Sequence, residues 1–192
     1  MRRLLIGVLA VSCLTELALA GDSFFSVGDD NDYLKLNRFR ADWYEEQLLA
    51  MHENSLFEDD STTTMYRFTW LRTFHHPMVF RLTLNRDGTG TLLGKMADGA
   101  GGYKPGKLVK EVSVPLTIEE ASLFETRLQD AEFWKMTARQ SGLGTDGAEW
   151  IWEARKNGLY RLVDRWSASD SDLGKVALDL MKKSGLELGE IY

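Results

Sequence analysis

Three acidic residues in the last quarter of the chain have types and spacing that could do chemistry. Glu149 and Glu153 precede an Asn-Gly dipeptide at 157–158, and Asp164 follows it. Asn-Gly is favoured in two-residue hairpin turns. Counting outward from such a turn places Asp164 between the two glutamates as a diagonal neighbour, at about 7–8 Å by Cα. Two carboxylates at this separation could serve as the acid and base of an inverting glycosidase.

Aromatic and basic side chains are expected on the same face of this predicted hairpin. They are Arg155, Tyr160 and Trp166, and we regard them as candidate binding residues for a sugar or a cationic ligand. The alternative interpretation is that the charges form ordinary cross-strand pairs on a solvated face. Trp150 and Trp152 would then belong to the core on the other side. The sequence leaves both interpretations open.

The chain has three histidines, two of which are adjacent. His75 and His76 stand before Pro77, in a predicted link between two strands. Adjacent side chains of an extended segment point to opposite sides, which disfavours chelation of one ion by both. A zinc site would need further ligands, and without cysteine these must come from His52 and carboxylates. We predict a strand corner, with a metal-binding protein centred on His75 and His76 as an alternative.

Two segments match cofactor motifs only in part. Residues 101–107, "GGYKPGK", have the spacing of a phosphate loop, but Leu108 replaces the Ser or Thr and a strand-like run replaces the helix. Residues 85–96 begin like a calcium loop, but Met96 stands where the bidentate glutamate belongs. No cofactor is therefore predicted. The glycine-rich loop 98–106 instead offers Tyr103 as a candidate binding residue.

The N-terminus has the pattern of a secretory signal peptide over residues 1–20. A basic start, an apolar run over residues 4–14 and Ala18-Leu19-Ala20 occur in the expected order. The pattern predicts export, most simply to the periplasm. Anchoring through a lipid on Cys13 is a minor alternative. Cleavage after Ala20 would remove this cysteine, the only one in the chain.

Charge and hydropathy exclude two classes of partner. The net charge is −6, and loss of residues 1–20 with Arg2, Arg3 and Glu16 would change it to −7. Nucleic-acid binding needs a basic surface, so no nucleic-acid partner is predicted. No second apolar segment reaches the length of a bilayer span, so no stable membrane insertion is predicted.

Periodicity predicts a single α+β domain over residues 38–192. A flexible acidic lead over 21–37 is followed by a helix over 38–56 and a linker over 57–63. Four strands with short hairpin links, a helix opened by a capping box, the Asn-Gly hairpin and a last helix come next. Sequential strands of this kind favour an antiparallel sheet of about six strands, with two or three helices packed on one face.

Three stretches carry a resemblance to known sequences. They are "FHHPMVFRLTLNRDGTGTLLGK", "GGYKPG" and "GTDGAEWIWEARKNGLYRLVDRW". Together they resemble a set of small exported bacterial proteins of uncharacterised function, over roughly residues 66–185. The resemblance implies an exported, bacterial, single-domain protein. It implies no catalytic residues.

Our functional hypothesis is a non-enzymatic binding or interaction module of the bacterial envelope. The basis is the abundance of Trp, Tyr and Arg, which interfaces favour, together with the lack of a convincing nucleophile or phosphate loop. The expected partner is an unknown envelope protein or a glycan. A glycan-acting hydrolase using Asp164 with Glu149 or Glu153 is the first alternative, and the metal-binding protein is the second.

Overall fold

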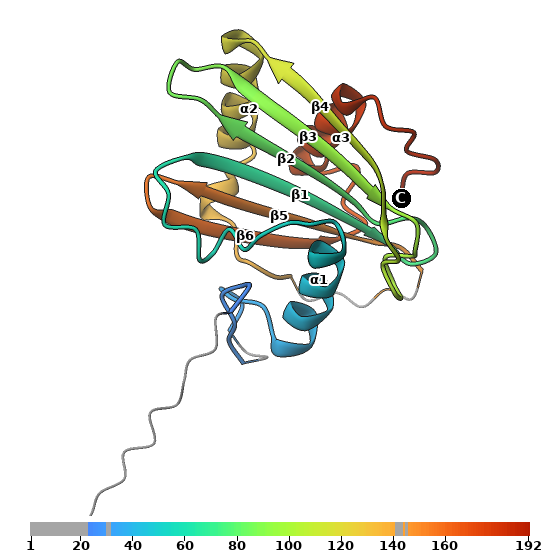
Figure 1. Ribbon diagram of the computed structural model, residues 1–192. Coiled ribbons are helices and arrows are strands. Elements are labelled where there is room, and N and C mark those ends of the chain that lie inside the picture. The colour runs from blue at the N-terminus through green and yellow to red at the C-terminus, as the bar shows by residue number, and fades with distance from the viewer. Residues whose placement is uncertain (1–22, 30–31, 141–143, 145) are drawn as a thin grey trace, which may run out of the picture.

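The protein is built around one antiparallel sheet. The computed structural model describes residues 23–29, 32–140, 144 and 146–192. The strands are β1 (Thr64–Arg72), β2 (Met78–Leu84), β3 (Gly90–Ala97), β4 (Leu108–Leu116), β5 (Ala148–Lys156) and β6 (Leu159–Trp166). Their order across the sheet is β4-β3-β2-β1-β5-β6 (Figure 1). The predicted α+β class with a six-stranded antiparallel sheet is confirmed.

The β5–β6 hairpin has the register predicted from its turn. Asn157 and Gly158 both have positive φ, at 52° and 78°, as a tight turn of this kind requires. Lys156 pairs with Leu159, and Ile151 pairs with Asp164. Because side chains alternate along a strand, this register places the three candidate carboxylates on one face of the sheet.

Two helices cover the opposite face. They are α2 (Ile118–Asp130) and α3 (Asp172–Ser184). Large rings of the central strands, such as Phe68, Phe80 and Trp152, are buried beneath them at 1% exposure or less. The predicted capping box of α2 is confirmed, since Thr117 and Glu120 each accept a hydrogen bond from the other's backbone N–H.

The third helix, α1 (Arg38–Ala50), lies against the face of the sheet that carries the carboxylates (Figure 1). It ends at Ala50, earlier than the predicted 56, because His52 takes a positive φ of 55° and turns the chain toward the sheet. Tyr44 and Leu48 of α1 are buried in a second apolar cluster with Leu71 and other strand residues. The central strands of the sheet are therefore covered on both faces.

The segment before α1 differs from the predicted flexible lead. In its described part, Phe24 and Phe25 are buried at 7% and 1% exposure, and Leu36 is fully buried. Val27 and Leu36 form a β-bridge. Burial of these apolar side chains outweighs the acidic composition that suggested a free segment. The predicted signal peptide and Cys13 lie outside the described residues.

The helices are short. The three α-helices have 13 residues each, and a 3-10 helix, η1 (Phe133–Lys135), follows α2. Within the part of the chain that the structure describes, none of them has the length and apolar character needed to cross a membrane.

Candidate functional sites

Glu149 and Asp164 meet beneath α1, where one arginine joins them. The Nη1 atom of Arg40 lies 2.6 Å from Oε1 of Glu149 and 2.8 Å from Oδ2 of Asp164. Tyr44 Oη donates to the same Asp164 oxygen at 3.0 Å. The cluster thus has two carboxylates and one cation, and we refer to Arg40, Tyr44, Glu149 and Asp164 as the acid-pair cluster.

The charge imbalance of this cluster changes the protonation of Glu149. Burial and, after it, the negative charge of Asp164 raise the pKa of Glu149 from 4.5 to about 8, against the opposing effect of Arg40. A hydrogen bond with Asp164 also favours the protonated form. At neutral pH, Glu149 is therefore largely a neutral acid.

The acid-pair cluster is closed to solvent. The side chains of Glu149 and Asp164 are only 4% and 3% exposed, and Arg40 at 24% is the most open of the three charged groups. A glycosidase needs its two carboxylates on either side of an accessible glycosidic bond. Here α1 occupies the position where a substrate would have to lie.

Glu153 belongs to a different buried cluster. Its Oε2 accepts from Arg67 Nε at 2.7 Å and lies 2.6 Å from Arg67 Nη2, and both side chains are fully buried. Tyr160 Oη donates to the other oxygen of Glu153 at 2.9 Å. Burial raises the pKa of Glu153, and Arg67 opposes that effect. Glu153 thus has a cation of its own and does not share a site with Asp164.

The same cluster fastens the chain after α1 to the sheet. Glu53 accepts from Lys95 Nζ at 2.6 Å, and its other oxygen lies 3.4 Å from Arg67 Nη1 and 3.2 Å from Arg81 Nε. Lys95 also donates to the carbonyl of Met51 at 3.0 Å. We refer to Glu53, Arg67, Arg81, Lys95, Glu153 and Tyr160 as the arginine-lysine cluster.

Sequence reasoning identified the carboxylates but missed their cations. Arg40 and Arg67 lie 109 and 86 positions from their glutamate partners along the chain. The one available signal was alternation in β1, where Arg67 stands between apolar residues. That pattern does not distinguish a buried arginine from a solvated one.

Of the four predicted binding residues, Tyr103 is the most exposed, at 62%. Tyr160 Oη donates its hydrogen bond to Glu153, and Arg155 donates to the carbonyl of Phe57 at 3.0 Å. The ring of Trp166 packs over Gly144 and Gly147, where an added Cβ would lie only 1.9 and 2.5 Å from ring atoms. These three side chains therefore have structural contacts.

The histidine pair holds the loop that carries Tyr103. His76 Nδ1 lies 2.8 Å from the carbonyl oxygen of Gly99, and the carbonyl of His75 accepts from Gly101 N at 2.9 Å. His75 Nδ1 lies 2.8 Å from Tyr192 Oη. His52 is separate, in the turn that ends α1. No group of three metal-binding side chains occurs among the described residues.

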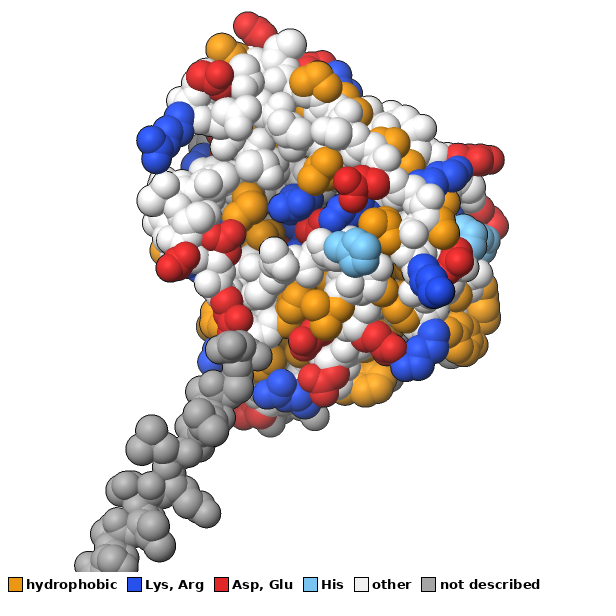
Figure 2. All heavy atoms as spheres, viewed as in Figure 1, with side chains coloured by type: hydrophobic (Ala, Val, Ile, Leu, Met, Phe, Trp, Pro, Cys, Tyr) orange, Lys and Arg blue, Asp and Glu red, His pale blue; other side chains and the backbone are white. Residues whose placement is uncertain are grey.

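Exposed aromatic rings gather where α1 meets the 98–106 loop. Phe39, Phe74 and Tyr103 are 75%, 60% and 62% exposed. The rings of Phe74 and Tyr103 stack at 6.2 Å between centroids, and Phe39 lies 6.4 Å from the ring of Trp43. Figure 2 shows exposed hydrophobic side chains, interspersed with charged ones, in the lower part of this view. We refer to Phe39, Trp43, Phe74 and Tyr103 as the aromatic surface.

Hydrogen bonds fix the two halves of the aromatic surface to each other. Trp43 Nε1 donates to the carbonyl of Gly101 at 2.9 Å, and Gln47 Nε2 donates to the carbonyl of Tyr103 at 2.7 Å. Gly101 is pressed against the end of β1, since an added Cβ would lie 2.7 Å from Arg72 O. The loop therefore presents Tyr103 from a fixed backbone.

Comparisons with known proteins give no family for this chain. Neither the protein-family models nor the curated protein sequences include a match to it. Function must be argued from the sites themselves.

Proposed function

We propose that this protein is an exported, non-enzymatic interaction module of the bacterial envelope that binds a partner protein through the aromatic surface. The observation that carries the proposal is the exposure of Phe39, Phe74 and Tyr103 on a backbone held by hydrogen bonds. Export rests on the signal-peptide pattern of residues 1–20 and on the resemblance to small exported bacterial proteins.

The chemistry of the aromatic surface supports a protein partner. Aromatic residues dominate the binding energy of protein interfaces, and rigid presentation lowers the entropy cost of association. Adjacent exposed aromatic rings form the kind of apolar patch that marks interaction sites on soluble domains. The Lys104–Glu46 ion pair, at 2.6 Å, adds a charged rim of the usual kind beside these rings.

The positions of the candidate carboxylates do not support glycan hydrolysis. Glu149 and Asp164 are covered by α1, and Glu153 is fully buried against Arg67. These contacts support a structural role, in which the two clusters hold α1 and the following turn on the sheet. That role in turn places the aromatic surface.

The test is capture from the source organism's envelope extract by the immobilised chain without residues 1–20. We expect the wild-type chain to retain a partner protein. The double substitution Phe74→Ala/Tyr103→Ala should lower the amount retained at least about tenfold, because both stacked rings are lost. Leu123→Ala is the matched control, since Leu123 is 53% exposed on α2, which packs on the opposite face of the sheet.

Both variants must first show the far-UV circular dichroism and thermal transition of the wild type. Equal capture by the double variant and the wild type would contradict the placement of the binding surface. Retention of a protease-resistant glycan in place of a protein would contradict the assigned class of partner.

A further inference from the structure

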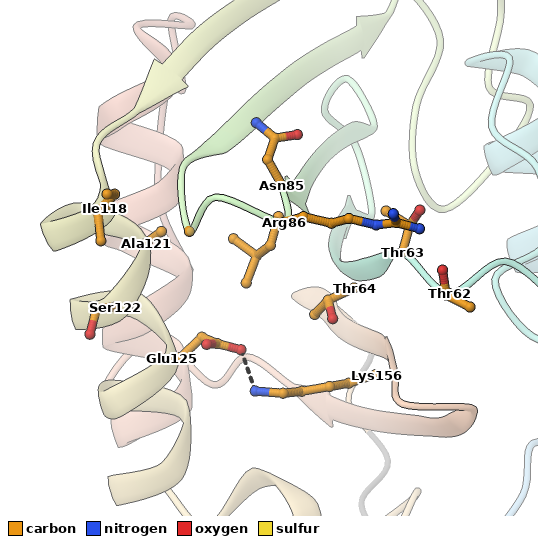
Figure 3. Close-up of a pocket in the computed structure, with 12 residues that line it drawn as sticks. Thr62, Thr63, Thr64, Asn85, Arg86, Ile118, Ala121, Ser122, Glu125 and Lys156 are labelled. Atoms are coloured by element: carbon orange, nitrogen blue, oxygen red, sulfur yellow. Dashed lines mark hydrogen bonds and ion pairs between the residues drawn. The ribbon is translucent and has the colours of Figure 1, made fainter.

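A polar hollow lies at the end of the sheet away from the aromatic surface. It is a cavity of about 450 Å³ between the start of β1, the β2–β3 turn and α2 (Figure 3). Its size falls within the usual range for small-molecule sites, which is about 300–1,000 Å³. We refer to it as the threonine pocket, because Thr62, Thr63 and Thr64 form one wall.

The floor of the threonine pocket carries a neutralised ion pair. Lys156 Nζ lies 2.6 Å from Oε1 of Glu125, and Tyr66 Oη donates to the same oxygen at 2.5 Å. The second carboxylate oxygen of Glu125 has no hydrogen-bond donor among the described residues. This pair therefore contributes no net charge, but it leaves one acceptor open to a ligand hydroxyl.

Arg86 supplies a further cation to the threonine pocket. In the part of the chain that the structure describes, its guanidinium makes no ion pair and no hydrogen bond. The neighbouring Asp87 is engaged by Thr89, whose backbone N–H and hydroxyl donate to Asp87 Oδ1 at 2.9 and 2.7 Å. Figure 3 shows the side chain of Arg86 lying along the pocket and reaching toward Thr63. The net charge of the pocket is therefore one positive unit.

Hydroxyl groups line the wall that Arg86 approaches. The side-chain oxygens of Thr62, Thr63 and Thr64 have no hydrogen-bond partner among the described residues. Each hydroxyl can both donate and accept. The opposite wall lies on α2 and combines apolar Ile118 and Ala121 with Ser122. Counting only contacts within the described chain, the pocket thus combines one unpaired guanidinium, a row of unbonded hydroxyls and a small apolar surface.

We propose that the threonine pocket binds a small hydroxylated monoanion, such as a sugar acid. Arg86 would pair with the carboxylate in the bidentate geometry that guanidinium favours. The threonine hydroxyls and the free oxygen of Glu125 would bind the ligand hydroxyls, and Ile118 would contact a ring face. A dianion such as phosphate suits the pocket less well, because one excess charge would stay unpaired in a protein whose net charge is −6.

The probe is D-glucuronate, with D-glucose and inorganic phosphate as comparison ligands. Binding is followed by the backbone amide shifts of the pocket residues in ¹⁵N-labelled full-length chain. We expect saturable shifts with glucuronate and an affinity at least about tenfold lower for glucose, since the carboxylate–Arg86 pair is missing. Arg86→Gln should lower glucuronate affinity at least about tenfold, and Thr63→Val several-fold, since each removes one direct ligand contact.

Arg38→Gln is the matched control, because Arg38 is an exposed arginine on α1, outside the pocket. The double variant Phe74→Ala/Tyr103→Ala should bind glucuronate as the wild type does, which separates this proposal from the one on the aromatic surface. Absence of saturable shifts with glucuronate would overturn the proposal, as would unchanged affinity in folded Arg86→Gln. Equal or tighter binding of glucose or phosphate would overturn the assignment of a monoanion.

Discussion

The two faces of the sheet are buried by different chemistry. Beneath α2 and α3, the strands present rings such as Phe68, Phe80 and Trp152. Beneath α1 and the chain around it, the same strands present charged side chains such as Arg67, Lys95 and Glu153, with 4% exposure or less. Both faces exclude water, but only the first does so with a continuous apolar layer.

This difference shows that alternation along a strand does not identify a solvated face. A buried charge is tolerated where a counter-charge and hydrogen bonds satisfy it. The arginine-lysine cluster meets that condition with three cations facing Glu53 and Glu153. The acid-pair cluster has only Arg40 for two carboxylates, so one of them keeps its proton. Charge balance, rather than burial alone, separates the two clusters.

The largest effect is expected from removing the cation at the centre of the arginine-lysine cluster. Arg67→Met keeps an unbranched side chain but removes the guanidinium, which leaves Glu153 without its ion-pair partner and the Asn54 carbonyl without its donor. We expect the free energy of unfolding to fall by about 3–5 kcal/mol, the usual cost of breaking a fully buried ion pair. Urea denaturation followed by tryptophan fluorescence measures this change.

The control for Arg67→Met is Arg38→Met, which removes an exposed arginine 3.6 Å from Asp42. Its stability should stay close to that of the wild type, because exposed ion pairs contribute little. If Arg67→Met also proved close to the wild type, the charged face would not depend on ion pairing, and the comparison of the two faces would fail.

A smaller, pH-dependent effect is expected from the acid-pair cluster. The pKa of Glu149 is about 8 in the folded protein, against an ordinary 4.5. Because the folded pKa is the higher one, its contribution to stability is fully present below about pH 4.5 and is lost as the pH rises through 8. Glu149→Gln imitates the protonated form at every pH. The variant should therefore gain stability relative to the wild type between pH 5 and pH 9, by more than about 1.4 kcal/mol.

The measurement is urea denaturation of both proteins at a series of pH values, with exposed Glu187→Gln as the control for the substitution itself. A difference between Glu149→Gln and wild type that stayed constant across this range would mean that Glu149 is ionised in the folded state. The folded protein would then not keep a proton on Glu149.

Much of the fold could be predicted from the sequence, because its signals are local. The turn at Asn157-Gly158 fixes the register of β5 and β6, and Thr117 with Glu120 marks the start of α2. The end of α1 could not be read in the same way, since it depends on Glu53 reaching Lys95 and Arg67 on strands that follow. Such a contact joins residues that no local pattern relates.

The candidate sites were less predictable than the fold. The hairpin register correctly places Glu149, Glu153 and Asp164 on one face, but whether that face is open depends on α1. The apolar pattern of α1 is weak, because part of its contact is polar: Arg40 pairs with Asp164 on the sheet, and Gln47 donates to the carbonyl of Tyr103 in the 98–106 loop. No sequence pattern pointed to the threonine pocket, because arginine and threonine in turns and linkers are usually solvated.

The smallest effect tests whether the helices themselves differ between the two faces. Asn37 caps α1 by accepting from Arg40 N at 3.0 Å, and Thr117 caps α2 by accepting from Glu120 N at 3.3 Å. Asn37→Ala and Thr117→Ala should each lower the free energy of unfolding by about 1 kcal/mol, because a cap satisfies local backbone groups whatever the helix packs on. Equal losses of unfolding free energy in urea denaturation would mean that the two faces differ through the side chains that touch the sheet, and not through the helices themselves. If Asn37→Ala cost as much as Arg67→Met, formation of α1 rather than charge pairing would control that face.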